Sequence, residues 1–296
     1  MNKHKWFLAG DRGLVGTNFK QLYNNVTGVN TSNCNLELYE DTISNIANKQ
    51  PSHVMINAST VGGLMDDIKN SFELYIKNLT IQNNIFRACS ELKIKNVLLQ
   101  GSTCAFPDLL MLQPYVEEDL FKSTPHESYL PTALPKLIGY QQCIAANTQF
   151  NYNWKTAILT NLFGPHDKVG EVAHAIGALM QKFIKNNNTI EVWGSGNQER
   201  DFLYIKDAIT AFDLIMNSNY DAVNVASGKT ISICELIDIL IKISGFKGKI
   251  IYNKDKPEGI LQRSISNKRL LSLGWKPQYL IEDALAETYG WYYDNI

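Results

Sequence analysis

Short apolar runs alternate with longer segments of helical periodicity through the first half of the chain. The runs that predict strands are Trp6–Ala9, a weaker one near Gly28–Asn33, His53–Ala58, Asn96–Gly101 and Thr156–Thr160. Helical spacing of apolar residues continues to about Tyr23, covers Asn70–Leu92, and returns between Pro131 and about Thr148. Strands that alternate with helices predict βαβ units, and therefore a doubly wound parallel sheet of the α/β class. Such a sheet binds its ligands at the carboxyl ends of the strands.

The second half of the chain has shorter elements. Turns are expected at Gly194–Gly196, Gly228 and Pro257–Gly259, and Ser232 with Glu235 forms a capping box for a helix that ends near Ile243. We therefore expect a Rossmann-type domain over 1–163, rejoined by about 204–226, and a smaller α/β substrate lobe over 164–296. The active site would lie in the cleft between the two.

Composition narrows the class of protein. The 296 residues carry a net charge of −1, with 45% hydrophobic and 19% charged residues, which is typical of a soluble globular protein and predicts no attraction to nucleic acid or membranes. No signal peptide and no apolar span of membrane length are recognised. The five cysteines are dispersed without a CxxC pair, which favours free thiols in the cytoplasm and predicts no metal site.

The first run leads into a glycine-rich turn. In Lys5–Gly16, KWFLAGDRGLVG, glycines recur at every third position, as Gly10, Gly13 and Gly16. Glycines in a strand-to-helix turn let the main chain approach a pyrophosphate, and the helix directs free N–H groups at it. The turn, with Arg12, Leu14 and Val15, is a candidate dinucleotide site. The alternative is a tight turn that binds nothing.

Three further stretches accompany the glycine turn. They are GSTCAFP from Gly101, PTALPK from Pro131, and TNLFGPHD from Thr160 with His174 beyond it. In order and spacing the four stretches resemble the extended short-chain dehydrogenase/reductase family, also called the NAD-dependent epimerase/dehydratase family. The most similar group within it is the GDP-L-fucose synthases, NADPH-dependent epimerase/reductases of a GDP-4-keto-6-deoxy sugar. The resemblance extends over nearly the whole chain, through Val192–Gly196, Arg200–Leu203 and Lys256–Gly259.

The resemblance implies a catalytic set with one departure. Ser102 matches the serine that binds the substrate C4 oxygen, and Lys136 matches the lysine that holds the nicotinamide ribose and lowers the pKa of a tyrosine four residues earlier. That tyrosine gives the proton to O4, but here its position is occupied by Thr132. A threonine hydroxyl ionises too reluctantly to act as a direct acid, although it can relay a proton. Thr132 could instead be the N-cap of a helix that starts late because of Pro135, and Tyr129 is either a substitute acid or an ordinary loop tyrosine.

The resemblance also implies an epimerising pair. Cys104 and His174 match the base and the acid that exchange protons at C3 and C5 of the sugar. A buried structural thiol and a helix-surface histidine are the simpler interpretations, and a pure reductase could retain both residues to bind substrate.

The cofactor implied by the resemblance is NADP(H). Arg12 matches the arginine that faces the adenosine 2′-phosphate, and the second strand ends without the acidic residue typical of NAD sites, which leaves Thr31 or Ser32 as minor donors. The other cofactor-binding residues implied are Asn57, Ala58, Ser59, Gly101, Lys136, Asn161 and Leu162. Contacts to the base and diphosphate of the nucleotide-sugar are implied for Lys182, Trp193, Arg200 and Arg263, with Arg200 as a bidentate clamp and core packing as the alternative for Trp193.

These features favour one reaction over others. Related 4,6-dehydratases carry an Asp-Glu pair where this chain has Cys104-Ala105, so dehydration is not expected. The expected activity is NADPH-dependent C4 reduction of a GDP-linked 4-keto sugar, a deoxyhexose or heptose, with or without C3/C5 epimerisation, in nucleotide-sugar synthesis for surface polysaccharide. We also expect a homodimer. The alternative is a catalytically silent relative that binds GDP-sugar and NADP and has a structural or regulatory role.

Overall fold

A computed structural model of the chain describes residues 4–60, 69–170, 173–185, 188–256 and 260–296. Its main sheet has six strands, all parallel, in the order β2-β1-β3-β4-β5-β9. The strands are β1 Trp6–Ala9, β2 Val26–Val29, β3 His53–Ile56, β4 Asn96–Ser102, β5 Asn153–Leu159 and β9 Ala222–Val225. The chain passes from β1 to β2 on one side and then to β3 on the other, so the strand order reverses at β1. The expected doubly wound α/β sheet is confirmed, and a ligand crevice belongs at this reversal.

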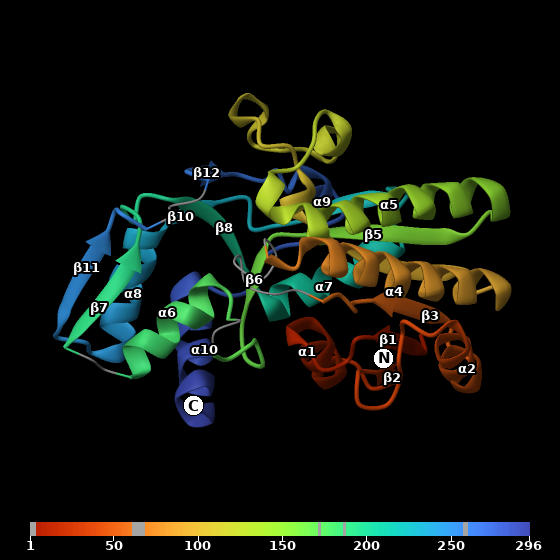
Figure 1. Cartoon of the computed structure of the whole chain (residues 1–296), viewed down its shortest axis with the longest axis horizontal. Coiled ribbons are helices and arrows are strands. Elements are labelled where there is room, and N and C mark those ends of the chain that lie inside the picture. The colour runs from red at the N-terminus through yellow and green to blue at the C-terminus, as the bar shows by residue number, and fades with distance from the viewer. Residues whose placement is uncertain (1–3, 61–68, 171–172, 186–187, 257–259) are drawn as a thin grey trace.

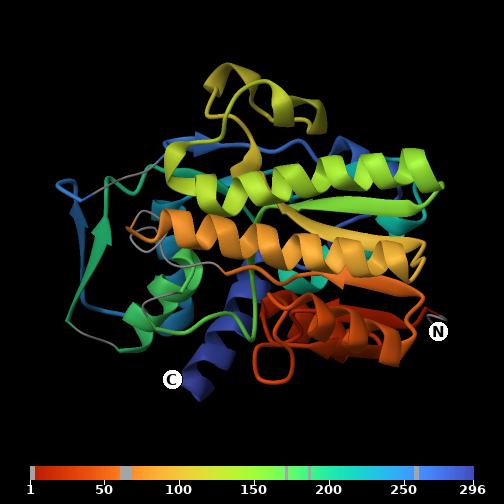
Figure 2. The same cartoon turned by 45° about the vertical axis from the view of Figure 1, so that its right-hand side comes forward.

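Helices cover both faces of this sheet (Figure 1). They are α1 Leu14–Leu22, α2 Tyr39–Lys49, α4 Ser71–Glu91, α5 Leu130–Phe150 and α7 Ile205–Met216. Figure 2 shows α4 and α5 side by side along one face. Alternate residues of β1 enter the two cores, Trp6 and Leu8 on the α1/α7 side and Phe7 and Ala9 on the α2/α4 side. Burial of both faces explains why the strands have continuous apolar runs.

The remaining elements form a smaller lobe at one end of the main sheet (Figure 1). A second sheet has the order β10-β8-β12, with β6 also paired to β8, and β7 pairs with β11. These strands are β6 Asn161–Phe163, β7 Thr189–Trp193, β8 Glu199–Tyr204, β10 Thr230–Ser232, β11 Lys249–Asn253 and β12 Gln262–Arg263. The helices of the lobe are α6 Ala175–Ile184, α8 Ile233–Ser244 and α10 Ile281–Asn295, whereas α9 Lys268–Ser272 lies against β9 of the main sheet. The capping box is confirmed, because Ser232 Oγ accepts from the N–H of Glu235 and Glu235 Oε2 accepts from that of Ser232.

Several element boundaries differ from expectation. β2 ends at Val29, because Asn30 begins a turn in which its carbonyl accepts the N–H of Asn33 at 3.0 Å. The expected glycine turns have positive φ, +81° at Gly194 and Gly196 and +77° at Gly228, whereas the expected turn at 257–259 lies outside the described residues. Within the ranges described above, no helix combines the length and apolar character needed to cross a membrane.

The expectation that Thr132 caps a late-starting helix is wrong. α5 begins at Leu130, its N-cap position is Tyr129, and Pro135 lies inside the helix. Pro135 has no N–H to bond the carbonyl of Pro131, but Asn78 Nδ2 of α4 donates to that oxygen at 3.3 Å. A side chain from the neighbouring helix therefore satisfies the acceptor that proline leaves open.

Candidate active site

The glycine turn connects β1 to α1 and lies beside the end of β3. Gly10 has φ +98°, and a Cβ there would meet the amide nitrogen of Ala58 at 2.8 Å; a Cβ on Gly16 would meet the carbonyl oxygen of Gly10 at 2.6 Å. Gly13 faces open space and is the N-cap of α1, whose first turn has no acidic residue and no capping side chain. Gly10 and Asp11 donate their N–H groups to the carbonyl of Val29, whereas the N–H groups in the first turn of α1 are available to an anion.

The residues directly after β3 bring polar groups close to the glycine turn. Asn57 donates its backbone N–H to Ala9 at 2.9 Å and its Nδ2 to the carbonyl of Gly10 at 3.4 Å, while its Oδ1 is buried without a partner among the described residues. Ser59 Oγ donates to Asn78 Oδ1 at 3.3 Å. The expected residues Asn57, Ala58 and Ser59 thus lie along the edge of the turn, and these three residues are called the cofactor rim below.

An acidic residue within the turn has a role that the sequence did not indicate. Asp11 is buried, accepts from Asn30 Nδ2 at 2.8 Å, and pairs with Lys20 Nζ at 2.9 Å. Burial raises its pKa, but the bonds from Asn30 and Lys20 outweigh this and hold the pKa below its usual range. Gly28 of β2 makes room, since a Cβ there would meet Asp11 Cβ at 2.6 Å. The neighbouring Arg12 is exposed, as are Thr31 and Ser32 after β2.

Two small adjoining cavities bring the expected catalytic and cofactor residues together. The first lies between β3, β4, α4 and α5, and its lining includes Asn57, Ala58, Ser59, Gln100, Thr132 and Lys136. The lining of the second, which lies between β4, β5 and α5, includes Gly101, Ser102, Lys136, Tyr140 and Ile158. Lys136 lines both cavities. It therefore connects the cofactor rim with Ser102.

The hydroxyl groups near Lys136 have different hydrogen-bonding states. Ser102 Oγ accepts the N–H of Cys104 at 3.1 Å, so its own proton remains available. Thr132 Oγ1 donates to the carbonyl of Tyr129 at 3.2 Å, so it presents lone pairs to the cavity rather than a proton. Burial lowers the pKa of Lys136, and Cys104 acts in the opposite direction.

Tyr129 belongs to a cluster with Cys104 and two arginines. The Arg263 guanidinium carbon lies 5.6 Å from the centre of the Tyr129 ring. Burial raises the pKa of Tyr129, which Cys104 raises further and which Arg263 and Arg200 lower. Tyr129 is therefore neither an isolated loop tyrosine nor a residue lining the two cavities described above.

The two arginines are neighbours on paired strands, because Arg263 of β12 and Arg200 of β8 are register partners. Arg200 Nη1 donates to the carbonyl of Glu199 at 2.8 Å, and burial lowers its pKa. Arg263 is 5% exposed and donates Nη1 to the carbonyl of Thr103 at 3.0 Å, whereas its Nη2 is buried with no partner in the described part of the chain. A buried unpaired guanidinium nitrogen is costly, so this position suits a ligand oxygen.

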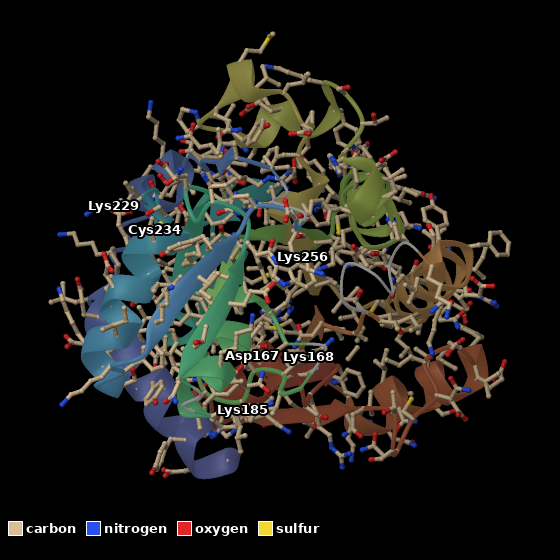
Figure 3. The ribbon with its side chains drawn as sticks, turned by 60° about the vertical axis from the view of Figure 1, so that its left-hand side comes forward. Asp167, Lys168, Lys185, Lys229, Cys234 and Lys256 are labelled. Carbon is tan, nitrogen blue, oxygen red and sulfur yellow. The ribbon has the colours of Figure 1, made fainter. Side chains whose placement is uncertain are left out.

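His174 lies at the N-cap position of α6 and is paired with Asp167. Its Nδ1 lies 2.9 Å from Asp167 Oδ1, the carboxylate is buried, and the imidazole is about half exposed. In Figure 3, Asp167 and Lys168 lie beside the red ribbon of the N-terminal part of the chain. Asn18 of α1 fixes the same loop by donating Nδ2 to the carbonyl of Pro165 at 2.8 Å. The sequence did not indicate Asp167 as the partner that orients His174.

The remaining expected residues lie in the smaller lobe or at its junction with the main sheet. Asn161 Nδ2 donates to the carbonyl of Asp201 at 2.9 Å, and Leu162 packs against the core. Lys182 Nζ donates to the carbonyl of Glu191 at 2.7 Å. Trp193 is 49% exposed, so core packing is wrong for this residue. No described contact joins Lys182 or Trp193 to the two arginines.

The protein is similar to known proteins over its full length. Residues 6–226 match the model of the NAD dependent epimerase/dehydratase family. The chain is 33% identical over 304 residues to putative GDP-L-fucose synthase 2 of Arabidopsis thaliana, covering 99% of this chain and 92% of that protein. It is 29% identical over 316 residues to GDP-L-fucose synthase of Escherichia coli K12, covering 100% and 98%.

The fold also matches solved structures. The structure of a GDP-6-OMe-4-keto-L-xylo-heptose reductase from C. jejuni superposes with a TM-score of 0.89 at 22% identity, covering 100% of this chain and 99% of that one. This likeness concerns the fold. With the family match, the full-length similarity and the glycine turn in place, the chain belongs to the NAD-dependent epimerase/dehydratase family and resembles its GDP-L-fucose synthases.

Proposed function

We propose that this protein is an NADPH-dependent oxidoreductase that reduces the C4 ketone of a GDP-linked 4-keto sugar of the deoxyhexose or heptose type. The observation that carries the proposal is that Ser102 and Lys136 line one cavity, directly beside a second cavity formed by Lys136 and the cofactor rim. A ketone oxygen held by Ser102 would lie next to the cavity whose lining includes Ala58, the residue against the glycine turn. The GDP-L-fucose synthases among the relatives support a GDP-linked substrate.

The glycine turn fits the pyrophosphate of NADPH. Gly10 and Gly16 leave no space for a Cβ, and the uncapped start of α1 offers N–H donors to an anion. Arg12 is the cation proposed for the 2′-phosphate, and the residue that follows β2 is Asn30 rather than an acid. Asp11 does not oppose this choice, because its charge is compensated by Lys20. When bound, NADPH would supply the hydride for the ketone carbon.

The arginine pair fits the diphosphate of the substrate. Arg200 and Arg263 are two buried or partly buried cations on adjacent strands, and one guanidinium nitrogen of Arg263 lacks a partner within the described residues. A diphosphate would offset the repulsion between the two cations and fill the open donor position. Lys182 and Trp193 are proposed to contact the nucleotide at the outer part of the smaller lobe.

Epimerisation of the sugar and dimer formation are also proposed. Cys104 and His174 are the groups proposed to exchange protons at C3 and C5, with Asp167 orienting the imidazole. A homodimer is proposed because α4 and α5 expose large apolar side chains, among them Phe72, Ile76, Ile138 and Phe150.

The decisive experiment is NADPH oxidation with a panel of GDP-linked 4-keto sugars, with the product stereochemistry read by NMR. We expect turnover with at least one GDP-sugar and none with the matching UDP- or dTDP-sugar. Equal rates with all three nucleotides would overturn the GDP assignment. Binding of both ligands without any NADPH oxidation would overturn the enzyme assignment and favour the catalytically silent relative.

A further inference from the structure

The sugar oxygen needs a proton donor, and the position four residues before Lys136 is occupied by Thr132. The proposed reaction needs such a donor, because the oxygen becomes an alkoxide when C4 accepts a hydride. Ser102 is assigned to hold the ketone oxygen, and Tyr140, which lines the same cavity, is a weaker acid because burial raises its pKa. Three further residues near the site carry a proton that could serve: Thr132, Tyr129 and Lys136. Their contacts differ in a way that separates them.

Thr132 and Tyr129 are poorly placed as donors. The hydroxyl proton of Thr132 is directed to the carbonyl of Tyr129 at 3.2 Å, away from the cavity. Tyr129 lines neither of the two cavities among the described residues, and its ring lies against Arg263 instead. Burial also raises the pKa of Tyr129, which makes the phenol a weaker acid.

Lys136 has the placement that the other two lack. It lies one helical turn beyond Thr132 on the same face of α5, and it lines the cavity of Ser102 as well as the cavity of the cofactor rim. Its ammonium makes no hydrogen bond to any residue that the structure describes. Burial lowers its pKa, in the direction that makes an ammonium a better acid.

We propose that Lys136 is itself the general acid of the reduction, and that Ser102 holds the ketone oxygen while the proton is transferred. This inference rests on the proposed function. C4 accepts the hydride, the π electrons of the carbonyl move to O4, and O4 takes a proton from the ammonium. The lysine is left as a neutral amine and recovers its proton from water. Thr132 lies one turn before Lys136 and presents its lone pairs to the cavity that both residues line.

The test compares Lys136→Arg with the parent protein. Arginine keeps the positive charge and the donors for a ribose, but its pKa is too high for it to act as an acid. We expect NADPH affinity, measured by fluorescence titration, to change by less than about threefold, while single-turnover NADPH oxidation falls by about 10²–10⁴-fold. Retained NADPH binding also shows that the variant is folded. The control is Lys155→Arg on β5, whose lysine lines neither cavity, and it should retain the rate within about tenfold.

A second measurement does not depend on turnover. Competitive acylation of the NADPH-free protein at a series of pH values gives the pKa of Lys136, and Lys155, another buried lysine on β5, is the internal reference. We expect the rate of the parent enzyme to fall with increasing pH through the pKa measured for Lys136 and not through that of Lys155. A full rate in Lys136→Arg, or a rate profile unrelated to the pKa of Lys136, would overturn the acid assignment alone. A parent protein without turnover on any GDP-4-keto sugar would overturn the proposed function, and the acid assignment with it.

Discussion

Arg263 permits a direct test of the nucleotide-sugar site, because it has one satisfied and one unsatisfied guanidinium nitrogen. Nη1 donates to the carbonyl of Thr103 at 3.0 Å, and Nη2 is buried without a partner among the described residues. The perturbation is Arg263→Met, which removes the charge and both donors while keeping a long side chain. Ligand binding and stability should respond very differently to this change.

The magnitudes follow from these contacts. Loss of Nη2 removes an unpaired buried donor, whose burial costs about 1–3 kcal/mol, whereas loss of Nη1 leaves the carbonyl of Thr103 unpaired at a similar cost. The two terms oppose each other, so we expect the free energy of unfolding of the ligand-free protein to change by less than about 1 kcal/mol. A lost charge-assisted hydrogen bond to the diphosphate is worth about 1.5–3 kcal/mol, so GDP should bind about 10–150-fold more weakly.

Arg269→Met is the matched control. Arg269 lies outside the proposed site, and its guanidinium pairs with the buried Glu117 at 3.4 Å and with Glu118. Its removal leaves the Glu117 carboxylate without its cation, and we expect a loss of about 3 kcal/mol, the lower end of the cost for a buried pair because Arg269 is partly exposed. Urea unfolding and calorimetry with GDP measure both quantities for both variants. Unchanged GDP affinity in Arg263→Met, together with a stability loss like that of the control, would refute the ligand role of Arg263.

Three other predictions concern the cofactor, the epimerising pair and the pH dependence of stability. Arg12→Ala should weaken the binding of NADPH by about 1.5–3 kcal/mol and leave the binding of NADH unchanged. Equal affinities of the two cofactors in the parent protein would contradict this prediction. Ketone substrate in D₂O without NADPH should gain deuterium at C3 or C5 in the parent and not in Cys104→Ser; a parent that takes up no label yet turns over NADPH would be a pure reductase. His53 is buried and its pKa is lowered to about 4 by burial and by His4, below the value of about 6.5 in the unfolded chain. The unfolded chain therefore binds more protons between these values, so this contribution is complete above about pH 6.5 and is lost as the pH falls toward 4, by about 3 kcal/mol in total. Urea unfolding of His53→Gln should show a flatter dependence over this range, and an unaltered dependence would assign it to other groups.

The local patterns of the sequence were sufficient for much of the fold. The parallel strands could be predicted because both faces of the sheet are buried, which leaves continuous apolar runs. Helix α8 could be predicted because Ser232 and Glu235, three residues apart, satisfy each other's backbone N–H groups. The glycine turn was found for the same reason, since Gly10 and Gly16 are required by contacts with nearby backbone. Each of these signals is carried by the segment itself.

The expected helix from Pro131 is present, and the alternative of a later start was wrong because the first turns of α5 are stabilised by residues distant in sequence. Pro135 weakens a helix judged by its own sequence, but Asn78, 53 residues before Pro131, donates to the carbonyl that proline leaves open. Gln82 of the same helix donates to the carbonyl of Pro135 at 2.8 Å, and Gly139 provides the space, since a Cβ there would meet Gln82 Oε1 at 2.6 Å. Only the packing of α4 against α5 reveals that these polar residues support a helix across a proline.

The site residues divide in the same way. Ser102 and Lys136 were expected from motifs within one strand or one helix, and the structure places both on the lining of one cavity. The partners Asp167 for His174 and Thr103 for Arg263 were not expected, because the first depends on a loop that bends back over seven residues and the second on two residues 160 positions apart. Sequence spacing identifies the groups that do chemistry more readily than the groups that hold them.

The role of Thr132 depends on its neighbours on α4 and α5. Asn78 binds the backbone of Thr60 on both its N–H and its carbonyl, at 2.7 and 3.0 Å, and also binds the carbonyl of Pro131. The cofactor rim and the first turn of α5 are thus fixed to one buried amide. The threonine in this turn returns its proton to the helix backbone and therefore does not supply an acid to the cavity. On the proposal above the proton comes from Lys136, one turn later, and this makes the Lys136→Arg variant more informative than a Thr132→Tyr variant.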